Sequence, residues 1–203
     1  MLTASSLIAE LDASLAAAPA DWRPGVLRRV VDLFVNDAER YDDEQIGLFD
    51  DVICRLMTNI ERLSLVELSN RLAGVNKAPA KAVVTLARHR DPAINGPILV
   101  NSATLPDREL AEIAAAEQAG LDVLTKIAAR ASLGEAVTDV LLKRGDAQIR
   151  RAIIANCDAR ISESGYARLV AGLNGDKALA AAVAAREDVP AELKPFLNAT
   201  LEA

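Results

Sequence analysis

The stretch DPAINGPILVN, residues 91–101, decides the fold of this chain, because a second copy follows it as DAQIRRAIIAN, residues 146–156. Both copies place an aspartate first, an isoleucine fourth, aliphatic residues eighth and ninth, and an asparagine last. The aliphatic spacing is that of one helix face, and aspartate is a favoured residue at the start of a helix. A similarity that returns after 55 residues is typical of stacked helix pairs.

A second pair of positions follows almost the same period. Ala129-Arg130 recurs 56 residues later as Ala185-Arg186. The composition agrees with a helical protein, since 51% of the 203 residues are hydrophobic but only 3% are aromatic. The apolar residues are mainly alanine and aliphatic residues, which favour closely packed helices over a β-sandwich.

Cap residues and apolar spacing predict about twelve or thirteen helices along the chain and no strand. Prolines and aspartates mark many of the starts, and glycines mark several of the ends. The predicted helices start near residues 3, 24, 43, 64, 79, 92, 105, 121, 134, 147, 163, 177 and 190. Turns of two to six residues between them make consecutive helices antiparallel neighbours.

The helices near the amino terminus are longer and show no repeat. We therefore expect an amino-terminal helical portion over residues 1–76, acting as a bundle or cap, and a helical-repeat portion over residues 77–203. No linker rich in serine and glycine separates them, so they are expected to pack as one continuous unit. The predicted fold is all-α, an irregular HEAT-like superhelix of antiparallel helix pairs.

Several stretches resemble a bacterial family of unknown function, domain of unknown function family 2336. The strongest is residues 91–110, which runs from the first copy of the repeat through SATLPDREL. Weaker similarities are Leu27 to Phe34, residues 48–52, 72–73, 78–79 and 127–130, and Asn156-x-x-Ala159-x-Ile161. The resemblance covers most of residues 25–170. It implies helix caps and packing positions, and its architecture is similar to HEAT-like repeats, which is information on fold alone.

The repeat positions Asp91, Asn101, Asp146 and Asn156 allow two interpretations. The aspartates are expected to cap helices, and buried asparagine amides at the helix ends can bond to free backbone groups of the next turn. The alternative is that the asparagines line a concave ligand surface. We favour the structural role.

Acidic residues concentrate before and within the third predicted helix, and the whole chain carries a net charge of −6. They either form a solvated surface that keeps the protein soluble or bind a basic partner. The candidate acidic surface consists of Asp42, Asp43, Glu44, Asp50 and Asp51.

Basic residues cluster around Gly145-Asp146 and form the opposite candidate. Lys143, Arg144, Arg150 and Arg151 are expected either to be an ordinary surface cluster or to meet an acidic partner. HEAT-like DNA glycosylases suggest a nucleic-acid alternative. It is disfavoured because the chain is acidic overall and few aromatic residues can stack on a base.

The sequence predicts no catalytic residues, no metal ligands and no cofactor. Histidine occurs once, at His89, so a zinc site or a Ser-His-Asp arrangement lacks its usual members. Histidine at the end of a helix is expected to interact with the free carbonyls there. Neither of the two common glycine-rich phosphate motifs occurs. We therefore expect the protein not to be an enzyme.

These observations predict a non-catalytic scaffold or regulatory adaptor that binds a protein partner. The two cysteines, Cys54 and Cys157, lie far apart among apolar neighbours, which is typical of reduced thiols in the cytoplasm. No signal peptide and no apolar run of transmembrane length is evident, so a cytoplasmic location without membrane insertion is expected. Association of two copies through the alanine-rich stretch 177–185 stays open.

Overall fold

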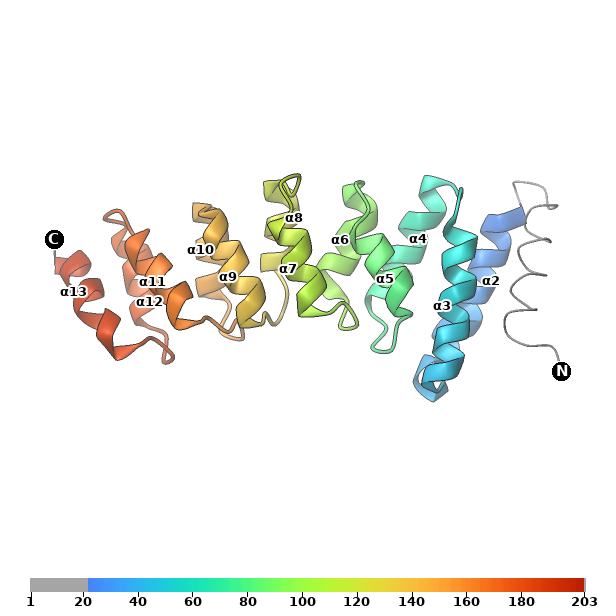
Figure 1. Cartoon of the computed structure of the whole chain (residues 1–203), viewed down its shortest axis with the longest axis horizontal. Coiled ribbons are helices and arrows are strands. Elements are labelled where there is room, and N and C mark those ends of the chain that lie inside the picture. Colours follow the sequence, from blue (N-terminus) through green and yellow to red (C-terminus); the bar gives the residue numbers. More distant parts are fainter. Residues whose placement is uncertain (1–21, 203) are drawn as a thin grey trace. The chain divides into compact units, whose positions relative to one another are not determined.

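The chain is described by a computed structural model that covers residues 22–202 (Figure 1). Within this range it forms twelve α-helices and two short 3₁₀ helices, with no strand. The all-α prediction is confirmed. The helix predicted at residues 3–17 lies outside the described residues, and the HEAT-like superhelix remains a prediction.

Two compact units divide the chain, one ending at Leu105 and the other beginning at Pro106. The division predicted from sequence, between residues 76 and 77, falls inside the first unit, between two of its helices. The described helices of the first unit are α2 (Trp22–Asp37), η1 (Ala38–Arg40), α3 (Asp43–Met57), α4 (Arg62–Ala73), α5 (Ala80–Ala87) and α6 (Pro92–Asn101).

In the first unit, alternate helices stack on one another. Helix α4 packs between α2 and α6, while α3 packs against α5, so the helices form two rows. Phe34, Ile53 and Leu72 are fully buried between the rows. Phe34 also contacts the rings of Tyr41 and Phe49, with centroid distances of 5.8 and 5.2 Å. Much of the small aromatic content of the chain is therefore used in this core.

The second unit repeats the two-row arrangement with shorter helices. Helix α9 packs between α7 and α11 in one row, and α10 packs between α8 and α12 in the other. The helices are α7 (Asp107–Ala115), α8 (Leu121–Ala128), α9 (Glu135–Arg144), α10 (Ala147–Ala155), α11 (Glu163–Ala171), α12 (Lys177–Ala184), η2 (Ala191–Leu193) and α13 (Lys194–Glu202).

The predicted helix caps account for most of the boundaries. Asp42 forms a capping box with Gln45 at the start of α3, and Ser162 accepts a hydrogen bond from the Gly165 N–H at the start of α11. Gly145 ends α9 with a φ of 76°, a left-handed conformation that glycine adopts without steric strain. None of the helices within residues 22–202 is long and apolar enough to cross a membrane.

Candidate functional site

An open groove of about 880 Å³ lies in the second unit, where the ends of several helices meet. It is formed by the start of α9, the end of α10, the loop between α10 and α11, the end of α12 and the residues after it. We call it the α10–α11 groove. Its lining residues are Glu135, Ile154, Cys157, Asp158, Ala159, Arg160, Ile161, Ala182, Ala185, Arg186, Glu187 and Asp188.

The loop between α10 and α11 is held in place by backbone and amide hydrogen bonds. The Arg160 N–H donates to the carbonyl of Leu133 at 2.9 Å, next to an isolated parallel bridge between Leu133 and Ala159. The Asn156 side chain donates to the carbonyl of Arg130 at 2.8 Å and accepts from the Asp158 N–H at 3.0 Å. The loop is therefore fixed against the segment that precedes α9.

Arg186, which follows α12, holds the same loop from the other side. Its Nη1 donates to the carbonyl of Asn156 and its Nη2 to the carbonyl of Ala159, both at 2.8 Å. Its Nε donates to the Tyr166 hydroxyl at 2.8 Å, and Asp188 accepts from Nε and Nη2 at 2.9 Å. Only 10% of the Arg186 side chain is exposed. The guanidinium is therefore occupied by protein acceptors.

Ionisation in this cluster follows from burial and pairing. Burial raises the pKa of Tyr166 to about 12, and the hydrogen bond that its hydroxyl donates to Asp188 adds to the increase. The Arg186 guanidinium lowers the pKa of Asp188 below its ordinary value, and the Tyr166 hydroxyl contributes. At neutral pH a neutral phenol therefore hydrogen-bonds to both an arginine cation and an aspartate anion, which also pair directly with each other.

The charged residues of the α10–α11 groove are mostly acidic and exposed. Arg160 lies 3.9 Å from Glu135, and Arg186 pairs with Asp188. Asp158 and Glu187 are exposed, and neither forms an ion pair with a basic side chain of residues 22–202. The groove therefore carries two uncompensated negative charges, and its lining also includes the buried side chains of Ile154, Ala159 and Ile161.

The predicted basic cluster lies outside this groove, and two of its four members bond to other parts of the second unit. Arg144 donates to the carbonyl of Ala119 at 2.8 Å, and Arg151 pairs with Asp176 at 2.8 Å. Arg150 packs so closely over Gly172 that an added Cβ there would lie 2.9 Å from its Nη1. Lys143 is exposed. Binding of an acidic partner by these residues remains a prediction.

The predicted acidic surface needs one correction, because Asp50 is only 5% exposed. Its two carboxylate oxygens accept the N–H groups of Lys81 and Ala82 at 2.8 and 2.9 Å, at the start of α5. A helix start carries unbonded N–H groups and partial positive charge, so it draws a carboxylate into the protein. Hydropathy alone could not reveal this neighbour.

The remaining members of the acidic surface are partly or fully exposed. Asp42 caps α3, and Asp51 pairs with Lys81 at 2.7 Å. Asp43 and Glu44 occupy the exposed first turn of α3. Their use by a basic partner remains a prediction.

The repeat positions behave as helix caps more than as a ladder of amides. Asp91 accepts from the Ala93 N–H at 2.9 Å, and Asp146 accepts from the Gln148 N–H at 2.7 Å. Asn156 makes the inter-loop contacts described above. Asn101, by contrast, is exposed at the end of α6, so the expected pair of buried amides is wrong for this member.

The structure gives the surroundings of the residue types that bind metals and of the single histidine, His89. In the described part of the chain, no three His, Cys, Asp or Glu side chains gather in a way that could hold a metal ion. His89 follows α5, and its Nδ1 accepts from the Asp91 N–H at 3.0 Å. The expected interaction with free carbonyls at the helix end is therefore replaced by acceptance of a backbone N–H at the next helix start.

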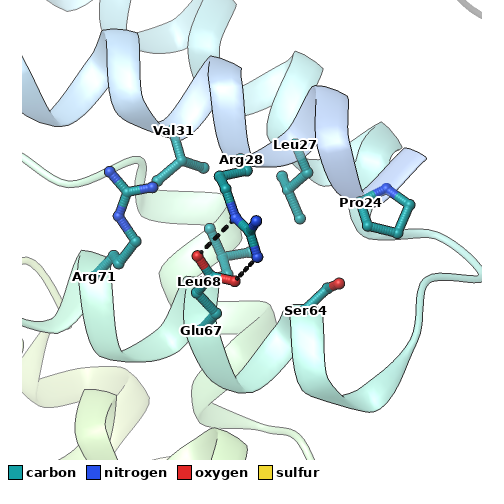
Figure 2. Close-up of a pocket in the computed structure, with 8 residues that line it drawn as sticks. All are labelled: Pro24, Leu27, Arg28, Val31, Ser64, Glu67, Leu68 and Arg71. Carbon is teal, nitrogen blue, oxygen red and sulfur yellow. Dashed lines mark hydrogen bonds and ion pairs between the residues drawn. The ribbon is translucent and has the colours of Figure 1, made fainter. Parts of the chain in front are cut away.

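A second hollow, in the first unit, is too small for a ligand. Figure 2 shows Arg28 on α2 facing Glu67 on α4, with Arg71 and Pro24 at the margins. The guanidinium donates to both carboxylate oxygens, at 3.0 and 2.7 Å, and the free space is about 10 Å³. This volume is about that of one water-sized probe, so we regard the feature as a clasp between two helices.

No role was predicted from the sequence for Arg186, the most important residue of the groove. Its signal was the recurrence of Ala129-Arg130 as Ala185-Arg186, which marks equivalent ends of α8 and α12. An arginine that follows a helix is normally expected to lie at the surface. Only the position of the neighbouring loop shows that Arg186 bonds to that loop. A repeated arginine at the same repeat position is the pattern that could have indicated a structural clamp.

The fold and the groove define an all-α protein of short stacked helices with an open loop-lined surface. Residues 94–199, more than half of the chain, match the family described as "Uncharacterised protein conserved in bacteria (DUF2336)". The chain belongs to this family, which confirms the resemblance seen in its sequence. No curated protein and no solved structure matches it significantly.

Proposed function

We propose that this protein is a non-catalytic protein-interaction scaffold of the bacterial cytoplasm and that the α10–α11 groove holds its partner. The proposal rests on one observation, the fixed backbone of an open groove. Asn156 and Arg186 hold the loop from opposite sides, at hydrogen-bond distances of 2.8 Å. A preorganised surface loses little conformational entropy when a partner binds, so contacts made there contribute more fully to affinity.

The chemistry of the groove favours binding over catalysis. Its one nucleophile, Cys157, is exposed, and none of the groove residues is a histidine that could act as its base. Tyr166 and Arg186 are both engaged within the protein. The groove therefore offers Cys157 neither the histidine base nor the orienting group that usually accompany a nucleophile in acyl transfer.

The nucleic-acid alternative has no supporting observation. Arg144 and Arg186 donate to backbone carbonyls, and Arg151 pairs with Asp176, so these cations are poorly placed for phosphate contacts. The groove itself contains more acids than bases. A phosphate backbone would be repelled there.

Photo-crosslinking in the native bacterium tests the proposed function. A photoreactive amino acid replaces Ala182, which is exposed and lines the groove. The matched control replaces Ala167, an exposed alanine on α11 that does not line it. We expect a discrete protein adduct from position 182 that position 167 does not give. Equal adduct patterns from the two positions would reject the groove as the binding surface.

A further inference from the structure

We infer that the occupant of the α10–α11 groove is a basic segment of a partner protein, one that combines lysine or arginine with a small aliphatic side chain. This inference rests on the proposed function and specifies its partner. The charge of the groove favours a cationic occupant. Asp158 and Glu187 line the groove, are exposed, and pair with no basic side chain of the described residues. Cations that enter the groove therefore gain attraction that solvent screens only in part.

The cations of the groove are themselves largely engaged within the protein. Arg186 uses Nε, Nη1 and Nη2 on Tyr166, Asp188 and two loop carbonyls, so it cannot turn toward an anion without breaking the clamp. Arg160 is 78% exposed and lies within reach of the Glu135 carboxylate. An acidic partner would thus meet two free carboxylates and only one available cation.

The size and lining of the groove suit a short segment with a few side chains. A volume of about 880 Å³ lies in the range, roughly 300 to 1,000 Å³, of pockets that enclose ligands of a few side chains. Ala182 and Ala185 line the groove and are exposed, and the lining also includes the buried side chain of Ile161. A lining that combines small apolar side chains with carboxylates complements a lysine or arginine whose neighbour is a small aliphatic residue.

The chain contains a probe of this groove in Cys157, whose exposed thiol is among the lining residues. The other cysteine, Cys54, is half-buried, and burial together with the Asp50 carboxylate raises the pKa of its thiol to about 12. Thiol–disulfide exchange needs the thiolate, so Cys157 reacts in preference to Cys54. A Cys157→Ser variant verifies the site of attachment.

The test equilibrates the purified protein with two peptide disulfides at equal concentration in a thiol buffer. One peptide is acetyl-Cys-Gly-Leu-Lys-Lys-amide and the other is acetyl-Cys-Gly-Leu-Glu-Glu-amide. Each mixed disulfide formed with Cys157 releases one thiol, and mass spectrometry gives the ratio of the two adducts. At low ionic strength we expect the lysine peptide to exceed the glutamate peptide roughly three- to tenfold. The ratio falls toward one at about 0.5 M salt.

Two double variants decide whether the groove carboxylates cause the preference. Asp158→Asn with Glu187→Gln brings the adduct ratio near one. Glu117→Gln with Glu192→Gln removes two exposed charges of the same unit outside the groove and keeps the ratio. Circular dichroism verifies that both fold. An equal or reversed ratio in the unmodified protein, or a ratio that the groove variant leaves intact, overturns the inference.

The tethering and crosslinking results separate the two proposals. An adduct from Ala182 without a cationic preference at Cys157 leaves the scaffold function in place and rejects the basic partner. A cationic preference without an Ala182 adduct rejects the proposed function and, with it, a protein as the occupant. Both results together support the inference.

Discussion

The two units solve the same backbone problem with side chains of opposite charge. In the first unit, the buried Asp50 carboxylate on α3 accepts the N–H groups at the start of α5. In the second unit, the Arg186 guanidinium after α12 donates to carbonyls of the loop that follows α10. Short helices leave many unbonded N–H and C=O groups at their ends, and each unit satisfies them from a neighbouring helix pair.

The Asp50 contact and the Arg186 contact differ in how close they lie to solvent. Asp50 is almost fully buried inside its unit, whereas Arg186 lines an open groove that also contains the exposed carboxylates of Asp158 and Glu187. In the second unit, the contacts of Arg186 fix the backbone of a loop that lines the groove. A fixed backbone at an open surface is the property that a binding surface requires.

The largest effect is expected from Asp50→Ala. This substitution leaves the Lys81 and Ala82 N–H groups without their acceptor in a buried place, so the free energy of unfolding should fall by about 2 to 4 kcal/mol. Urea denaturation followed by the fluorescence of Trp22, the single tryptophan of the chain and part of the first unit, measures the change. Asp51→Asn, which alters an exposed ion pair, is the control and should shift the midpoint much less. Similar shifts for the two variants would contradict the role given to Asp50.

A smaller loss is expected from Arg186→Ala, about 2 kcal/mol, because the groove loop loses two donors while solvent can partly replace them. Urea denaturation followed by circular dichroism measures it. Arg186→Lys should recover only part of the loss, since an ammonium cannot reproduce the planar fork. Arg151→Ala removes an exposed pair with Asp176 and should leave the midpoint unchanged. If Arg151 and Arg186 proved equivalent, the clamp would be no more than a surface ion pair.

The smallest effect concerns pH and the Tyr166 hydroxyl. Its pKa is about 12 in the folded protein, above the ordinary value of 10.0 that the unfolded chain is expected to have. The unfolded state therefore loses its proton first, so this contribution to stability is complete below pH 10 and disappears as the pH rises toward 12. Between pH 9 and 12, the urea midpoint of the Tyr166→Phe variant should decline less steeply with pH than that of the unmodified protein. Parallel declines would show that the phenol does not titrate as its surroundings predict.

The sequence predicted the helices well because their signals are local. Asp42, Asp146 and Ser162 each cap a helix as expected, and Gly145 ends one. Caps act on backbone groups two or three residues away, so a single sequence contains all the information that they need.

The candidate site was not predicted, because its contacts join segments that are far apart in the sequence. Arg186 reaches back 30 residues to Asn156, and Asp50 reaches forward 32 residues to Ala82. Charge patterning treated Asp50 and Arg144 as surface residues, since nothing local distinguishes a solvated charge from one that bonds to a distant backbone. The free carboxylates Asp158 and Glu187 gained meaning only when the groove placed them together.

The reach of these contacts also bears on how the chain emerges from the ribosome. Several hydrogen bonds from side chains to loop carbonyls of the second unit span 25 to 30 residues, among them the Arg144 contact with Ala119 and the Arg186 contact with Asn156. Each one can form once two further helices have been synthesised, without waiting for the end of translation. Nascent chains of this kind can gain structure in the order of synthesis, so exposed apolar helix faces need protection by chaperones only over a short length of polypeptide at a time.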